Sequence, residues 1–114
     1  MPTHDDWTMT EDQLLAEVTA RCDQRRIRWV HVTNVHHSKQ AGHLRGFPDL
    51  FLCGISGVLF RELKSENGKW RGIQGRQVDW KWALVAAGQD WAVWTPSDLT
   101  SGLIDQQLAR LARP

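Results

Sequence analysis

Apolar residues in the N-terminal part of the chain first recur every three or four positions and then alternate with polar ones. The helical period is carried by Leu14, Leu15, Val18 and Cys22. It predicts a helix over residues 10–25, with Thr10 as its N-cap and acids in its first turn. Residues 27–33 alternate and are rich in β-formers, so they are predicted to form a strand. Residues 1–9 precede this pattern and are expected to be loosely ordered.

Two apolar runs in the middle of the chain, residues 49–53 and 58–64, flank a short Gly-Ile-Ser-Gly segment. Two β-type runs joined in this way predict a β-hairpin. Residues 36–46 and 65–72 on either side of it are polar and contain glycine. Both stretches are therefore predicted to be loops.

The C-terminal part shows a helix, a strand and a second helix. Residues 73–87 have apolar positions at helical spacing, and Gly88 follows in the place that a helix C-terminus favours. Residues 90–95 are predicted to form a strand, and Ser97 is expected to cap a final helix. The apolar stripe of that helix is Leu103, Ile104, Leu108 and Leu111. The predicted order is α-β-β-β-α-β-α, and residues 10–114 form a single α/β domain.

Length and composition fit this interpretation. The chain has 114 residues, of which 41% are hydrophobic and 24% are charged, as in an ordinary globular domain. It shows neither a membrane-length apolar stretch nor a signal peptide, so we expect a cytoplasmic protein with no membrane partner. Cys22 and Cys53 are too few for a disulfide framework or a zinc cluster. We interpret them as two buried thiols in a reducing compartment.

The net charge is only +1, but the basic residues are unevenly distributed. Residues 24–48 hold four histidines and no acid, and a second basic group follows the hairpin. The basic residues of the two groups are Arg25, Arg26, Arg28, Lys39, Arg45, Lys64, Lys69, Arg71, Arg76 and Lys81. A local basic surface suits a polyanion such as DNA, although a solvated charged face explains the pattern equally well. Trp70 is a candidate for stacking on a base, or else a residue that folds back on the core.

The hairpin register brings two acids together. If the turn lies at residues 55–56, the numbers of opposed residues sum to 111, so Asp49 faces Glu62. Lys64 lies two residues further on and points to the same side. Opposed carboxylates repel each other, and a divalent cation such as Mg²⁺ between them would remove the conflict. The lysine would then activate water or stabilise charge on a phosphate. The alternative is a strand end with ordinary surface charges.

A longer ordered set of residues surrounds this acid pair. It comprises Gly46-Phe47-Pro48-Asp49-Leu50, Phe60-Arg61-Glu62-Leu63-Lys64, Gly68-Lys69, Gln77, Trp80, Leu84, Ala87-Gly88 and Val93-Trp94-Thr95-Pro96-Ser97-Asp98. The order and spacing of these residues resemble the PD-(D/E)XK nuclease superfamily and, within it, the virus-type replication-repair nuclease (VRR-NUC) family. The resemblance implies a restriction-endonuclease-like fold, in which helices flank a mixed β-sheet.

The resemblance also implies roles for the paired residues and their neighbours. Asp49 and Glu62 would be metal ligands, and Lys64 would be the catalytic lysine. The backbone carbonyl of Leu63 would provide a further contact to the metal. No organic cofactor is expected beside Mg²⁺, for which Mn²⁺ would substitute.

Two further residues are assigned by the same resemblance. The family uses a glutamate from its first helix near the metal. We assign this role to Glu11, because the Thr-Glu start of the helix matches the family, with Glu17 as the alternative. Either acid would otherwise be a solvated helix residue. Gln77 matches the glutamine that begins the family's second helix, where it would bond the lysine or a phosphate, or only the first turn of its helix.

Taken together, these residues predict a Mg²⁺-dependent DNA endonuclease whose products carry 5′-phosphates. A domain this small has little surface for reading sequence, so selectivity for branched or four-way DNA is favoured. Stand-alone family members resemble Holliday junction resolvases. The resemblance therefore implies a homodimer that acts in DNA repair, in a bacterial or phage-infected cell.

Three other hypotheses stay open. A nuclease-fold module that binds DNA without cutting it would not require the acids and the lysine. A nuclease subunit of a larger DNA-processing complex would have little activity alone. A small-molecule or structural protein would leave the set of two acids and a lysine unexplained.

Overall fold

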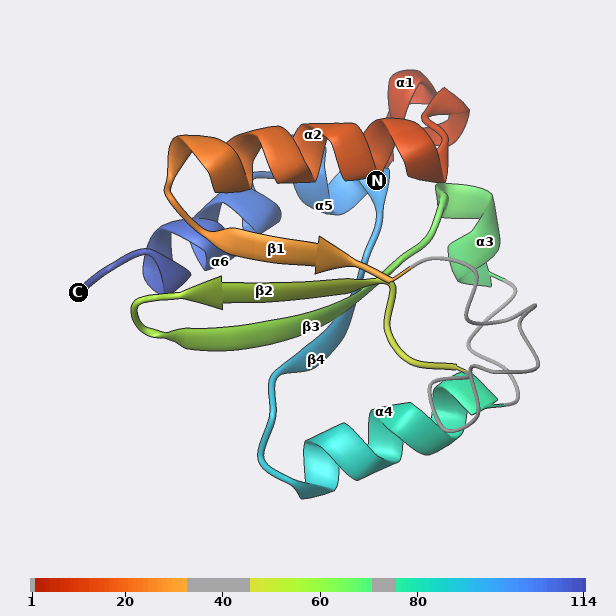
Figure 1. Cartoon of the computed structure of the whole chain (residues 1–114). Helices are drawn as coiled ribbons and strands as arrows, with labels where there is room; N and C mark the ends of the chain where they lie inside the picture. The colour runs from red at the N-terminus through yellow and green to blue at the C-terminus, as the bar shows by residue number, and fades with distance from the viewer. Residues whose placement is uncertain (1, 33–45, 71–75) are drawn as a thin grey trace.

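The computed structural model describes residues 2–32, 46–70 and 76–114, and it leaves undescribed the side chains of residues 69–70 and 76–78. The described chain begins and ends with helices, and a second pair of helices separates its first three strands from the fourth (Figure 1). The elements are α1 (His4–Thr8), α2 (Glu11–Gln24), β1 (Arg28–His31), β2 (Leu50–Gly54), β3 (Gly57–Leu63), α3 (Glu66–Trp70), α4 (Arg76–Ala86), β4 (Trp91–Trp94), α5 (Pro96–Thr100) and α6 (Leu103–Leu111). Within these described ranges, no helix is both long and apolar enough to cross a bilayer.

The four strands form one mixed sheet in the order β1-β2-β3-β4. Strand β2 runs antiparallel to both of its neighbours, whereas β3 and β4 are parallel. A parallel pair requires a crossover connection, and the segment that contains α3 and α4 provides it. Figure 1 shows α2, α5 and α6 on one face of the sheet and α4 on the other. The predicted α/β class, with helices flanking a mixed sheet, is confirmed.

The element order differs from α-β-β-β-α-β-α at three places. A short helix, α1, lies within residues 1–9, and a second one, α3, lies within the predicted polar loop 65–72. The last helix begins before Ser97, because Thr95 is the N-cap and its amide donates to Asp98 Oδ2 at 2.9 Å. Gly102 then adopts a φ of 88° and divides the predicted helix into α5 and α6.

Helix α1 is fixed to the rest of the molecule by one buried acid. Asp6 is only 3% exposed, and it accepts hydrogen bonds from the Thr100 hydroxyl at 2.5 Å and the Thr3 amide at 2.8 Å. The bond from Thr100 is the main reason that the pKa of Asp6 lies below its ordinary value. The N-terminal segment, expected to be loosely ordered, is thus tied to α5 by its own hydrogen bonds.

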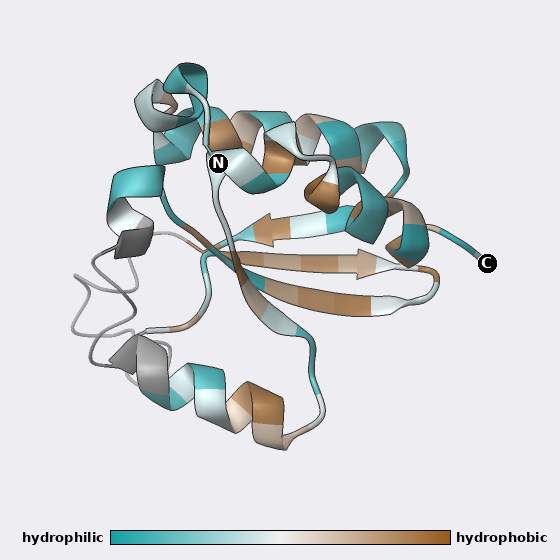
Figure 2. Ribbon diagram, turned by 180° about the vertical axis from the view of Figure 1, so that it is seen from behind, coloured by the Kyte–Doolittle hydropathy of each residue, from teal (hydrophilic) through white to brown (hydrophobic). Residues whose placement is uncertain are grey.

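The apolar core lies on the face of the sheet that α2 and α6 cover. Its buried residues are Leu14, Val18, Cys22, Ile27, Leu50, Leu52, Leu59, Leu63, Trp94, Ile104, Leu108 and Leu111. Figure 2 shows the matching apolar stripe along α2 and the apolar strands beneath it. Both cysteines are free, as expected; Cys22 is fully buried, whereas Cys53 is only partly buried. Burial raises the pKa of the Cys22 thiol to about 11.

Aromatic side chains occupy the opposite face, toward α4. The ring of Phe60 contacts two others, with its centroid 5.2 Å from that of Phe51 and 6.0 Å from that of Phe47. Phe47 in turn packs edge-on against Trp80 of α4 at 4.9 Å. Phe47 thereby links the segment before β2 to α4.

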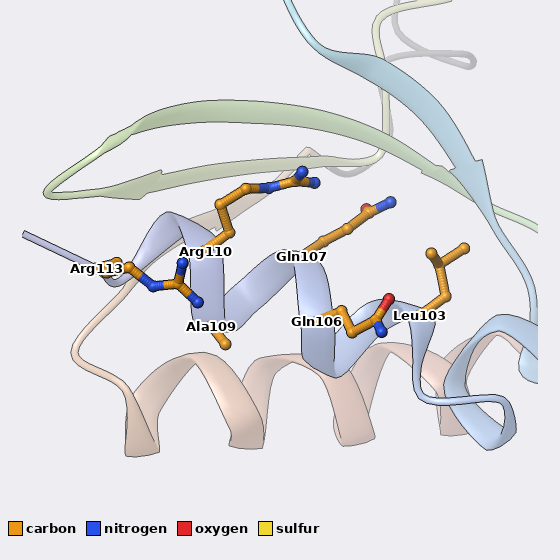
Figure 3. A pocket seen from close by; sticks show the side chains of 6 residues that line it. All are labelled: Leu103, Gln106, Gln107, Ala109, Arg110 and Arg113. Carbon is orange, nitrogen blue, oxygen red and sulfur yellow. The ribbon is translucent and has the colours of Figure 1, made fainter.

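A buried arginine joins β3 to α6. Arg61 is 1% exposed, donates to Gln107 Oε1 at 3.0 Å and forms an ion pair of 3.0 Å with Asp90. Its guanidinium lies 4.9 Å from the ring centre of Trp94, whose indole N–H donates to the same Gln107 oxygen. Figure 3 shows Gln107 extending from α6 toward the sheet. Burial lowers the pKa of Arg61, and the charge of Asp90 opposes that shift.

The hairpin turn rests directly on the end of α6. The amide of Ser56 donates to the Leu111 carbonyl at 3.1 Å. A Cβ atom on Gly54 would lie 2.5 Å from that carbonyl oxygen and 2.8 Å from Leu111 Cγ. Gly54 therefore allows a close approach that no other residue permits without moving backbone.

We expect Gly54→Ala to lower the free energy of unfolding by roughly 1–3 kcal/mol, because the added methyl group meets a backbone oxygen that cannot move away. Ile55→Ala is the matched control, since Ile55 is 74% exposed and its truncation should cost no more than about 0.5 kcal/mol. Urea denaturation of both variants measures the difference. Equal stabilities would contradict the close contact between the turn and α6.

Candidate active site

The site begins with the register of the hairpin. Phe51 is paired with Phe60 and Cys53 with Val58, as the sequence predicted. Asp49 directly precedes β2, and Lys64 directly follows β3. Extending the same register by one residue places Asp49 opposite Glu62.

Asp49 and Glu62 meet side chain to side chain. One carboxylate oxygen of Asp49 accepts a hydrogen bond of 2.9 Å from the Leu63 amide, which holds the side chain over the end of β3. Glu62 is 2% exposed, and its side chain interacts with that of Asp49. The two acids therefore meet at the end of the hairpin, where each disfavours the charged form of the other.

The electrostatics of Glu62 show which other side chains lie nearby. Burial raises the pKa of Glu62 from 4.5 to about 9, and the hydrogen bond and charge of Asp49 add to the shift. The charge of Glu11 raises this pKa further, whereas that of Lys64 lowers it. Such effects weaken with distance, so these charges lie within electrostatic range of Glu62. Asp49, Glu62, Lys64 and Glu11 thus form one group, here called the acid–lysine cluster.

The structure separates the two candidate helix glutamates. Glu11 begins α2, and a Cβ atom on Gly68 would lie 3.7 Å from both Glu11 Oε1 and Lys64 Cβ. Gly68 therefore lies close to both of these residues. Glu17 instead pairs with Arg21 on its own helix at 2.6 Å and is not among the charges that act on Glu62. Of the two acids, only Glu11 belongs to the acid–lysine cluster.

The main chain around Lys64 is held from the C-terminal side. The Lys64 amide donates to the Trp94 carbonyl at 3.0 Å. Two residues later, Glu66 is 1% exposed and its carboxylate accepts from the Ser97 amide, in the first turn of α5, at 2.6 Å. Sequence reasoning missed Glu66, because its partner is 31 residues away and no local pattern connects the two.

Some predicted site features lie outside the described residues. Gln77 is in the first turn of α4, but its side chain is not described, and the same holds for Trp70. The basic segment 36–46 is described only at Gly46. The amide of Leu63 bonds to Asp49, whereas contact of its carbonyl with a metal stays a prediction.

The described residues contain no ready-made group of three or more His, Cys, Asp or Glu side chains placed to hold a metal ion. The acid–lysine cluster offers a contacting pair of carboxyls, with Glu11 within electrostatic range. A pocket of about 440 Å³ on α6 is far from these residues in sequence (Figure 3). It is lined by Leu103, Gln106, Gln107, Ala109, Arg110 and Arg113.

Comparison of the chain with protein-family models, curated proteins and solved structures finds no match.

The raised pKa of Glu62 predicts how stability depends on pH without metal. The folded protein holds this proton more tightly than the unfolded chain, so the stabilisation is complete below about pH 4.5 and is lost as the pH rises toward about 9. Glu62→Gln removes this dependence. We expect the variant to be more stable than the wild type at pH 8.5, by on the order of 2 kcal/mol, and to gain nothing at pH 5.

Urea denaturation in EDTA at the two pH values measures this effect. Glu17→Gln is the control, because Glu17 is an exposed acid of α2 outside the acid–lysine cluster. If Glu62→Gln is destabilised equally at both pH values, the charged form of Glu62 does not destabilise the folded protein.

Proposed function

We propose that the chain is a metal-dependent DNA endonuclease of the PD-(D/E)XK type, related to the VRR-NUC family. The observation that carries the proposal is the contact between the carboxyls of Asp49 and Glu62, in a buried setting beside Lys64. Bringing a second acid against buried Glu62 destabilises the fold by itself, because one member must be protonated or the two must repel. A divalent cation between them would offset this repulsion.

The donor set fits Mg²⁺ or Mn²⁺. Both prefer oxygen ligands, and Mg²⁺ is usually held by one or two carboxylates, with water and substrate oxygens completing its coordination. Asp49 and Glu62 would be the carboxylates, Glu11 would act from α2, and the Leu63 carbonyl is the further candidate. When bound, such an ion supplies charge stabilisation to a phosphodiester and makes water more acidic.

Each residue of the acid–lysine cluster then has a separate task. Lys64 lies near Glu62 and can orient the attacking water or neutralise the charge that develops on phosphate. The Leu63 amide keeps Asp49 pointed at the site through its 2.9 Å hydrogen bond. Burial of Glu62 excludes solvent from one side, which strengthens electrostatic interactions there.

Branched DNA and a homodimer complete the proposal. Two active sites related by a two-fold axis could cut two opposed strands of a four-way junction. Strand β1 is at the edge of the sheet, where Val30 is 54% exposed and Trp29 is 38% exposed. Exposed apolar side chains on an edge strand support pairing with a second copy of the chain.

Metal binding is expected to stabilise the protein through Asp49. At pH 8 and a saturating concentration of Mg²⁺ or Mn²⁺, we expect the midpoint of thermal unfolding to rise by at least about 4 °C over its value in EDTA. Asp49→Asn should lose this rise, and Glu17→Gln should keep it. Thermal unfolding measures the effect, and isothermal titration measures metal binding directly. An undiminished rise of the midpoint in Asp49→Asn would show that the metal does not bind at Asp49 and Glu62.

Cleavage is tested on fluorescent linear, flap and four-way DNA, with Mg²⁺ and with EDTA. We expect metal-dependent cutting, with branched DNA preferred. Asp49→Asn and Lys64→Ala should each slow it by on the order of 10²-fold or more, because each removes a group that stabilises the transition state. Glu17→Gln is again the control.

Two outcomes would contradict the proposal. Cleavage that survives Asp49→Asn would show that another site performs the chemistry. Metal-independent binding of branched DNA, without cleavage even in Mn²⁺, would instead favour a nuclease-fold binding module.

A further inference from the structure

A pocket of about 480 Å³ lies where α1 meets the start of α2. Trp7 lines it from α1, Glu11 from α2, and Ser65 and Asn67 from the segment that follows Lys64. Glu11 belongs to the acid–lysine cluster, and Ser65 is the next residue after Lys64. The pocket therefore adjoins the candidate active site, although no part of the function proposed above uses it.

Trp7 is held in an exposed position by a well-anchored helix. Its side chain is 45% exposed, which leaves a large apolar surface in contact with water. Helix α1 begins with a capping box between Thr3 and Asp6, and Asp6 is also bonded to Thr100. These bonds fix the position of α1 and therefore of the Trp7 backbone. The anchored helix thus keeps Trp7 among the residues that line the pocket.

The charge of the pocket selects between the parts of a nucleotide. Its described lining contains the acids Glu11 and Asp12 and includes no lysine or arginine. A phosphate group is therefore disfavoured in it wherever no bound cation offsets these charges. An uncharged base can stack on the indole, and the side chains of Ser65 and Asn67 can hydrogen-bond to its edge.

We propose that this pocket binds the nucleobase next to the scissile phosphate, with the base stacked on Trp7. The proposal rests on the nuclease function above and specifies its substrate, since the base must be unpaired to enter. Unpaired bases occur at flaps, branch points and single-stranded ends. The pocket would thus favour such DNA over a continuous duplex without any contact to a particular sequence.

The test compares Trp7→Phe, which keeps an aromatic face, with Trp7→Leu, which keeps apolar bulk but cannot stack in the same way. Binding of a fluorescent flap oligonucleotide is measured by anisotropy, with Ca²⁺ replacing Mg²⁺ so that cleavage does not interfere. Trp82→Leu is the matched control, because Trp82 is 60% exposed on α4 and does not line the pocket. Thermal unfolding verifies that all three variants fold.

We expect Trp7→Leu to weaken binding at least about fivefold, Trp7→Phe to weaken it less than about twofold, and Trp82→Leu to leave it unchanged. A series of flaps, each with one abasic position, locates the base. When the missing base is the one that stacks on Trp7, the wild type should bind the abasic flap as weakly as Trp7→Leu binds the complete flap. Trp7→Leu should bind that abasic flap and the complete flap with the same affinity.

The outcomes separate this proposal from the nuclease assignment. If the wild type cleaves DNA but Trp7→Leu binds every flap as tightly as Trp82→Leu does, the base pocket is overturned and the nuclease proposal stands. Binding that depends on Trp7 without cleavage would overturn the nuclease and keep the base pocket. Absence of both binding and cleavage would overturn both. Loss of self-association in Trp7→Leu with unchanged DNA binding would assign the ring to a protein contact instead.

Discussion

The register between β2 and β3 is the constraint on which the candidate site depends. A slip of one residue would send every side chain of one strand to the opposite face, so Asp49 and Glu62 would no longer meet. Several contacts oppose such a slip: Phe51 packs on Phe60, and the turn is hydrogen-bonded to the end of α6. The acids are thus brought together by packing and turn contacts, against their own repulsion.

This repulsion is tolerated because the two faces of the sheet have different tasks. The face toward α2 and α6 carries the buried apolar cluster, together with the network of Arg61, Gln107 and Trp94. The other face carries aromatic contacts toward α4 and, at one end of the hairpin, Asp49 and Glu62. The contacts on the first face stabilise the fold enough to tolerate two neighbouring acids at the end of the second. Strain confined in this way is common at functional sites.

Local sequence signals were sufficient where neighbours along the chain determine the structure. The hairpin, its register, the Thr10 cap and the glycine after α4 depend on contacts within a few residues, and all were predicted. Helices α1 and α3 escaped prediction because each is short, and because the acids Asp6 and Glu66 have partners far along the chain. Glu11 and Glu17 show the same limit at the site. The Thr-Glu helix start favoured Glu11 by resemblance, but only the docking of that helix against the hairpin shows which acid lies near Glu62.

The bond between Glu66 and the first turn of α5 has a consequence for how the protein can evolve. It ties the backbone that follows Lys64 to the C-terminal helices, so their packing is transmitted to the amine. A substitution that disturbs the packing of α5 would therefore be felt at Lys64, although none of its atoms belongs to the acid–lysine cluster. The C-terminal helices thus constrain the candidate site from a distance, and their sequence cannot vary independently of it.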